Sequence, residues 1–169
     1  WIMPEVTVTN AALMADVTPA EFEIGSAVVS YGGTKLGGTD NAPTLSVEPV
    51  FRESKCDQNG DNPVALFIVG YNIKVKAKFK EIEKALAVVI GPNKKLSAAD
   101  FGKDLIGSGK ELLLVGLKRS FKLPKAVPTG GWEYPISGTE EHGIEIEFTG
   151  YQDLATGVFL EEVAAGGGE

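Results

Sequence analysis

The chain has 169 residues, of which 43% are hydrophobic and 23% charged, an ordinary composition for a folded domain. Its formal net charge of −7 argues against binding nucleic acid through the phosphates, which needs a cationic surface, and against docking on an anionic membrane. A single cysteine, Cys56, excludes an intrachain disulfide and fits a reducing compartment. No apolar run approaches the roughly 20 residues of a membrane-spanning helix, and we expect no secretory signal at the start.

The first third of the chain predicts short strands separated by turns. Residues 1–19 show no sustained hydrophobic period, and we expect an arm or lead-in there. Residues 22–31 predict a strand, and residues 32–43, rich in glycine, predict a loop. Residues 44–51 alternate as a strand. Because Pro49 has no backbone N–H to donate, this strand should be an edge strand or contain a bulge.

The clearest pattern lies in residues 71–80, where apolar and polar side chains alternate without exception. The apolar positions are Tyr71, Ile73, Val75, Ala77 and Phe79, and the polar positions are Asn72, Lys74, Lys76, Lys78 and Lys80. Side chains on a strand project with period two, so this strand should form one wall of a core with lysines outside. The preceding residues 64–69 are apolar nearly throughout, which predicts a strand covered on both faces, after a polar turn at residues 57–62.

At Glu81 the period changes to that of a helix. Ile82, Ala85, Leu86 and Val89 form the apolar stripe, and Gly91 with Pro92 predicts the end of the helix. The other expected elements are a loop at 93–109 with Ser97 as a helix N-cap, a buried strand at 111–117, a basic segment running extended along the surface at 118–128, an alternating strand at 143–149, a turn at 153–157 and a last strand at 158–163.

These elements predict one mainly β domain over residues 20–163, a β-sandwich or barrel with one flanking α-helix and extended loops or arms, followed by a flexible tail at 164–169. Two charged strand faces stand out. Glu145 and Glu147 would complement Lys74, Lys76 and Lys78 if their strands are neighbours. Two separately solvated faces would explain the same pattern.

Catalytic chemistry is not predicted. The single histidine, His142, lies in a turn and is expected to be exposed, and Cys56 has no histidine near it in sequence. The serines lack the nucleophile-elbow motif. Paired carboxylates such as Glu161 and Glu162 are common on surfaces. We therefore expect no enzyme, no cofactor and no metal site.

Two partial ligand motifs also fail. Asp57, Asn59 and Asp61 have the spacing of a calcium loop, but Asn62 replaces the turn glycine and Ile68 replaces the closing glutamate, so a hairpin turn is the better interpretation. The sequence GSGK at residues 107–110 has the end of a phosphate loop. It lacks the first glycine and the magnesium-binding hydroxyl of that motif.

Three stretches resemble the bacteriophage tail tube (major tail) proteins. They are GSAVVSYGGTKLGGTDNAPTLSVEP, then CDQNGDNPVALFIVGYNIKVKAKFKEIEKAL, and finally GIEIEFTGYQDLATGVFLEE. The family's D-Q-x-G-x-x-P-V hairpin is matched by Asp57, Gln58, Gly60, Pro63 and Val64, and its K-E pair before the helix by Lys80 and Glu81. The resemblance covers roughly residues 22–91 and 143–162.

The resemblance implies a structural protein whose protomers form rings, six to a ring, that stack into a hollow tube through which DNA passes without specific binding. Implied partners are copies of the chain and other tail proteins (tape measure, terminator, distal tail), without a membrane, in a virion tail assembled in the host bacterial cytoplasm. Residues 1–19 and 32–43 are implied contacts between subunits, as is the hairpin. The hairpin residues are Arg52, Glu53, Ser54, Lys55, Cys56, Asp57, Gln58, Asn59, Gly60, Asp61 and Asn62.

Two alternative functions remain open. One is another virion part, such as a tail terminator, a connector or a capsid decoration protein, for which a ring without axial growth would be the sign. The other is a carbohydrate-binding β-sandwich with Trp132, Tyr134 and Tyr151 as a stacking platform. Packing in a core or an interface would also explain these aromatics.

Overall fold

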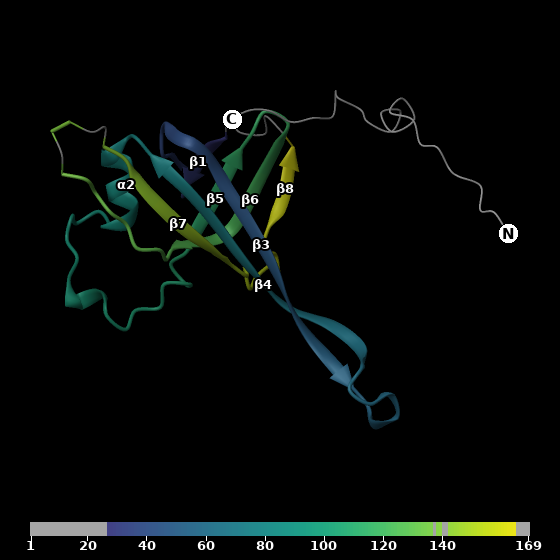
Figure 1. The fold of residues 1–169 in the computed structure, drawn as a ribbon. Coiled ribbons are helices and arrows are strands. Elements are labelled where there is room, and N and C mark those ends of the chain that lie inside the picture. Colours follow the sequence, from purple (N-terminus) through teal and green to yellow (C-terminus); the bar gives the residue numbers. More distant parts are fainter. Residues whose placement is uncertain (1–26, 137, 140–141, 165–169) are drawn as a thin grey trace, which may run out of the picture.

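The computed structural model describes residues 27–164 except 137, 140 and 141. The expected arm at 1–19, the start of the first strand and the end of the tail lie outside these residues. The fold is mainly antiparallel β with one α-helix (Figure 1). The elements are β1 (Val28–Tyr31), β2 (Thr34–Lys35), β3 (Thr39–Lys55), β4 (Pro63–Phe79), α2 (Ile82–Val89), β5 (Lys110–Val115), β6 (Arg119–Pro128), β7 (Ile144–Tyr151) and β8 (Glu161–Ala164), with 3-10 turns at Asp57–Asn59 and Ala98–Asp100.

The strands form one sheet in the order β2-β1-β5-β6-β7-β4-β3, with β8 also paired to β6. β6 is the strand that joins the two halves. It pairs with β5 along one side, and on its other side it pairs first with β8 (residues 119–122) and then with β7 (residues 125–128). Pro124 lies between these two stretches, where its missing N–H breaks no recorded ladder pair. The segment predicted at 118–128 is therefore extended as expected, but its predicted position along the surface is wrong, since it lies inside the sheet.

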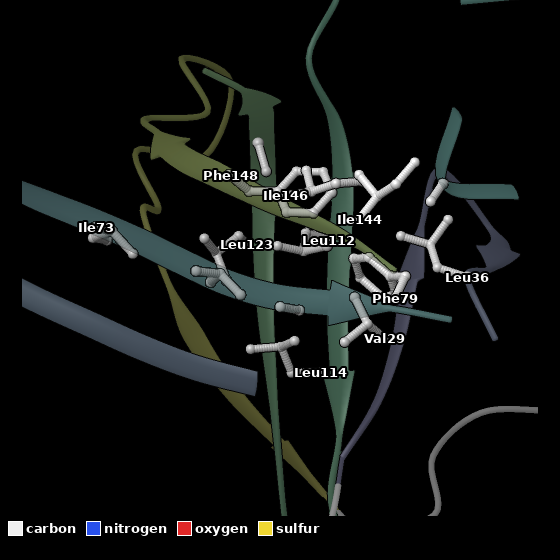
Figure 2. Close-up of a cluster of buried hydrophobic side chains, with 14 residues drawn as sticks. Val29, Leu36, Ile73, Phe79, Leu112, Leu114, Leu123, Ile144, Ile146 and Phe148 are labelled. Atoms are coloured by element: carbon white, nitrogen blue, oxygen red, sulfur yellow. The ribbon is translucent and has the colours of Figure 1, made fainter. Parts of the chain in front are cut away.

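The core lies between the β4–β7 half of the sheet and the β1–β5–β6 half (Figure 2). Its largest fully buried side chains are Phe79, Phe148, Leu36, Ile73, Leu112, Leu123, Ile144 and Ile146. Burying one such side chain contributes about 1.5–3 kcal/mol. The Tyr31 ring lies 5.0 Å from that of Phe148, and its hydroxyl donates a 2.8 Å hydrogen bond to the Ala126 carbonyl. Burial raises the pKa of Tyr31 above its ordinary value.

Several predicted elements are confirmed. In β4 the side chains of Ile73, Val75, Ala77 and Phe79 are buried as predicted, whereas Tyr71, predicted on the same face, is 41% exposed. The helix α2 covers residues 82–89 with Ala85 in the core. Gly91 has a φ of 90° after the helix, a conformation that glycine adopts without strain. Ser97 caps the 3-10 turn by accepting a hydrogen bond from the Ala99 backbone N–H.

Other predictions need correction. The strands expected at 64–69 and 71–80 are one 17-residue strand, β4, which continues through Gly70. β3 is also 17 residues long and starts at Thr39, so it takes in the end of the expected loop at 32–43, which also contains β2. The last strand is shorter than expected and includes Ala164, a residue that the sequence predicts to lie in the tail. Strand length depends on pairing with a partner, which local periodicity does not report.

Candidate self-assembly surface

The β3–β4 hairpin extends well beyond the rest of the sheet. β7 pairs with β4 only from Ile73 to Phe79, so β4 before Ile73 has β3 as its only recorded strand partner among the described residues. At the base of this part, the Tyr71 ring packs edge-on against Phe159, with the ring centroids 5.6 Å apart. Residues 48–72, which we name the hairpin arm, project from the body (Figure 1). The prediction of an edge strand around Pro49 is confirmed, since β3 ends the sheet and Pro49 pairs with Tyr71.

The hairpin arm carries large apolar side chains on both faces. Phe51 is opposite Ile68 on one face, and on the other face Phe67 is opposite Arg52. Phe67 and Ile68 are 56% and 57% exposed. The other large exposed hydrophobic residues of the arm are Val50, Phe51, Val64, Leu66, Val69 and Tyr71. Within the part of the chain that the structure describes, the prediction that residues 64–69 are covered on both faces is therefore wrong.

Exposing the apolar side chains of such a hairpin to water is energetically unfavourable. A two-stranded hairpin alone is marginally stable, and an exposed contiguous apolar surface on a folded protein usually marks a binding site. Both β3 and the outer part of β4 also have an edge without a strand partner among the described residues, and another chain can pair with the backbone groups of such an edge. The arrangement can thus bind a protein surface through apolar contacts and strand addition.

The tip of the arm is a compact polar turn, as predicted. All of the hairpin residues singled out in the sequence, 52–62, are exposed, with 52–55 in β3 and the rest in the turn. The Asn59 backbone N–H donates to the Cys56 carbonyl at 3.1 Å, and the Asn59 side chain donates to the Asn62 carbonyl at 3.3 Å. Gly60 has a φ of 62°, which favours glycine. Local hydrogen bonds therefore shape the tip.

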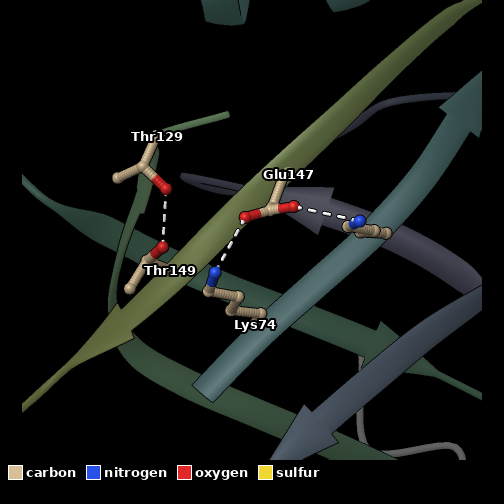
Figure 3. A network of polar contacts seen from close by, with 5 residues as sticks. Lys74, Thr129, Glu147 and Thr149 are labelled. Carbon is tan, nitrogen blue, oxygen red and sulfur yellow. Dashed lines mark hydrogen bonds and ion pairs between the residues drawn. The ribbon is translucent and has the colours of Figure 1, made fainter. Parts of the chain in front are cut away.

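The charged strand faces are neighbours in the structure. β4 and β7 pair so that Lys76 is opposite Glu147 and Lys78 is opposite Glu145. The Glu147 carboxylate contacts Lys74 Nζ at 3.4 Å and Lys76 Nζ at 3.3 Å (Figure 3). Hydrogen bonding from Lys76, followed by that from Lys74, lowers the pKa of Glu147 below its ordinary value.

Lys78 departs from the simple pairing pattern. Its Nζ lies 3.5 Å from Asp40 of β3 rather than bridging to Glu145. Three lysines on the outer face of β4 thus contact two carboxylates, one from each flanking strand. Since these contacts are exposed, each one stabilises the sheet only weakly.

The three aromatics considered for carbohydrate binding do not form one platform. Trp132 and Tyr134 pack against the core and line a hollow of about 660 Å³ with Lys78 and Glu145, whereas Tyr151 ends β7 outside that lining. The Tyr134 hydroxyl is 2.8 Å from His142 Nδ1, and His142 is half-buried rather than exposed as predicted. Packing explains two of the three rings.

The described part of the chain has no group of three or more His, Cys, Asp or Glu side chains that could hold a metal ion. Within the same residues, no helix is long and apolar enough to cross a membrane. Cys56 is exposed at the tip of the hairpin arm.

Sequence reasoning found the hairpin tip and the charged faces but missed the apolar sides of the hairpin arm. The signal was present in the uninterrupted apolar run at 64–69. That run is also typical of a strand buried within its own domain. Only the length of the β3–β4 pairing shows that the run lies beyond the core.

Comparison with known proteins gives a likeness of fold among the solved structures. No family model matches the chain, and no curated protein matches it. Among solved structures, the cryo-EM structure of the anti-feeding prophage cap (AFP tube terminating cap) is similar, with a TM-score of 0.51 and 12% sequence identity. The alignment covers 91% of this chain and 99% of the cap chain. The chain therefore shares the fold of a protein described as a tube-terminating cap.

Proposed function

We propose that this protein is a structural subunit of a tail-type tube, which assembles with copies of itself into a ring. The observation that carries the proposal is the hairpin arm, whose two faces expose large apolar side chains and whose outer strand edges have no strand partner among the described residues. A surface of this kind is stabilised when a neighbouring subunit covers it. The fold likeness to a tube-terminating cap supports the same class of function.

Within such a tube, the subunit has two possible positions. The likeness to a terminating cap favours a ring that ends a tube and does not stack on itself. The resemblance of the hairpin motif to tail tube proteins favours the repeated ring. We place the terminating position first, because that fold match spans nearly the whole of both chains. In either position DNA or another cargo would pass through the ring, and other tail proteins would contact it.

Electron microscopy and mass measurement of the purified protein at increasing concentration test the proposal. We expect closed rings of uniform mass that do not extend into tubes. Extended tubes would instead assign the repeated position. A protein that remains monomeric at every concentration, with or without a preassembled tail tube, would contradict the proposal.

A further inference from the structure

If the protein forms rings, as in the proposed function on which this inference rests, the hairpin arm needs a surface on the next subunit to bind to. A ring closes through a heterologous contact, in which two different surfaces of the same protein meet. The arm is one of these surfaces. The second must be exposed, complementary and out of reach of the arm of its own chain.

The segment between α2 and β5 has these properties. We name residues 92–109 the loop surface. Phe101 is 83% exposed and Leu105 is 55% exposed. Leu96 and Ile106 are exposed as well. Four large apolar side chains within eleven positions are more than the scattered exposure normal for a monomer.

Local hydrogen bonds hold the loop surface in shape without burying these side chains. The Ser97 hydroxyl caps the Ala98–Asp100 turn, and Asp104 Oδ1 accepts a 3.0 Å hydrogen bond from the Ile106 backbone N–H. Lys103 Nζ bonds to Asp100 Oδ1 at 3.2 Å. The exposed residues Phe101 and Leu105 lie between these contacts, so the apolar surface is already formed before a partner arrives.

The charges of the two surfaces are complementary. The hairpin arm contains four acids and two bases, and its tip exposes Asp57 and Asp61. The loop surface contains three lysines and two aspartates, and Lys94 and Lys95 lie near its start. No ion pair is recorded for any of these four residues within the described part of the chain. Opposite charges at the edge of an interface speed association and fix its orientation.

The positions of the two surfaces favour a contact between different molecules. Figure 1 places the hairpin arm and the loop surface on opposite flanks of the body. The arm extends about eight residues beyond the shared sheet, which corresponds to roughly 25 Å of strand. It therefore points away from the loop surface of its own chain and toward a neighbour.

We propose that the hairpin arm of one copy packs on the loop surface of the next copy, with Phe67 and its neighbours against Phe101 and Leu105. Asp57 and Asp61 at the arm tip face Lys94 and Lys95. This contact repeats around the ring with each subunit giving one arm and receiving another.

Two variants test this contact. The arm variant carries Leu66→Ser and Phe67→Ser, and the loop variant carries Phe101→Ser and Leu105→Ser. All four side chains are exposed, so both variants should fold, as checked by circular dichroism and thermal unfolding. Each variant alone should remain monomeric in analytical ultracentrifugation at concentrations at which the wild type forms rings. Mixed together they should form a one-to-one dimer, because each still has the surface that the other lacks.

A charge reversal provides a matched control. The double variant Asp57→Lys, Asp61→Lys should associate about tenfold or more weakly than the wild type. Mixing it with the double variant Lys94→Asp, Lys95→Asp should restore association, because the charges at the contact are then opposite again. If the loop variant forms rings as the wild type does, or if the mixture stays monomeric, this contact is overturned while the proposed function stands. If the wild type itself never assembles, the proposed function fails as well.

Discussion

At the scale of single residues, Gly150 shows how tightly the two halves of the sheet meet. It lies in β7 opposite Ile73 of β4 on one side and Ala126 of β6 on the other. A Cβ atom at this position would lie 2.7 Å from Leu123 Cδ2 and 3.3 Å from Ile73 Cβ. Because Ile73 and Leu123 are fully buried, neither side chain can move aside freely.

Gly150→Ala should therefore destabilise the fold by about 1–3 kcal/mol through overpacking of the core. Denaturant unfolding measures the change. Gly131→Ala is the matched control, since a Cβ there meets nothing within 4 Å, and it should change stability by less than about 0.5 kcal/mol. Equal effects of the two substitutions would mean that the close contacts around Gly150 do not limit stability.

At the scale of elements, the hairpin arm and the body are separable. The core cluster includes Ile73 and the buried residues that follow it in β4, but no residue of the hairpin arm is among its fully buried members. β4 thus contributes to the core with one half, and with the other half it forms the exposed surface for which we propose a partner. The stability of the domain should depend on the first half and assembly on the second.

A shortened hairpin tests this separation. Replacing residues 51–69 with Asn-Gly joins Val50 to Gly70, which already pair, through a two-residue turn suited to hairpins. The melting temperature should change by no more than about 3 °C, because no core contact is removed, while ring formation should be lost in sedimentation measurements.

The control for arm length is a variant with the full-length arm and three substitutions, Leu66→Ser, Phe67→Ser and Ile68→Thr. It should also fail to form rings, because its apolar surface is gone although its reach is unchanged. Rings from the shortened protein would show that assembly uses another surface.

At the scale of the whole molecule, the net charge is unevenly distributed. All 16 lysines and arginines lie in the described residues, together with 16 of the 23 acids. The described residues thus carry equal numbers of acids and bases, and the excess of seven acids belongs to residues 1–26, 140–141 and 169. Lys74, Lys76 and Lys78 contact carboxylates, so the outer face of β4 is no cationic track for DNA.

The protein should consequently show no salt-sensitive binding to duplex DNA, because binding to phosphates requires an excess of cations that release counterions. Fluorescence anisotropy with a labelled duplex at about 50 mM and 200 mM salt measures this. A histone-like basic protein serves as the positive control. Binding that falls steeply between the two salt concentrations would contradict a conduit through which DNA passes without being held.

The sequence by itself determined the elements that depend on interactions between residues close together in the chain. The alternation at 71–80, the helix stripe at 82–89 and the polar hairpin turn at 57–62 follow from side-chain period and turn chemistry, which act over a few residues. The charged faces of β4 and β7 were also predicted from the sequence. Their being neighbours was one of two open interpretations, and the strand pairing settled it.

Only the tertiary structure decided the role of the remaining segments. Residues 118–128 looked like a surface segment because of their lysines and prolines, yet they form the strand that joins both halves of the sheet. Residues 64–69 looked like core, yet they are exposed on the hairpin arm. The physical reason is that burial depends on which distant strands lie alongside. An apolar strand that remains exposed can have the same residue pattern as a strand that is buried in the core.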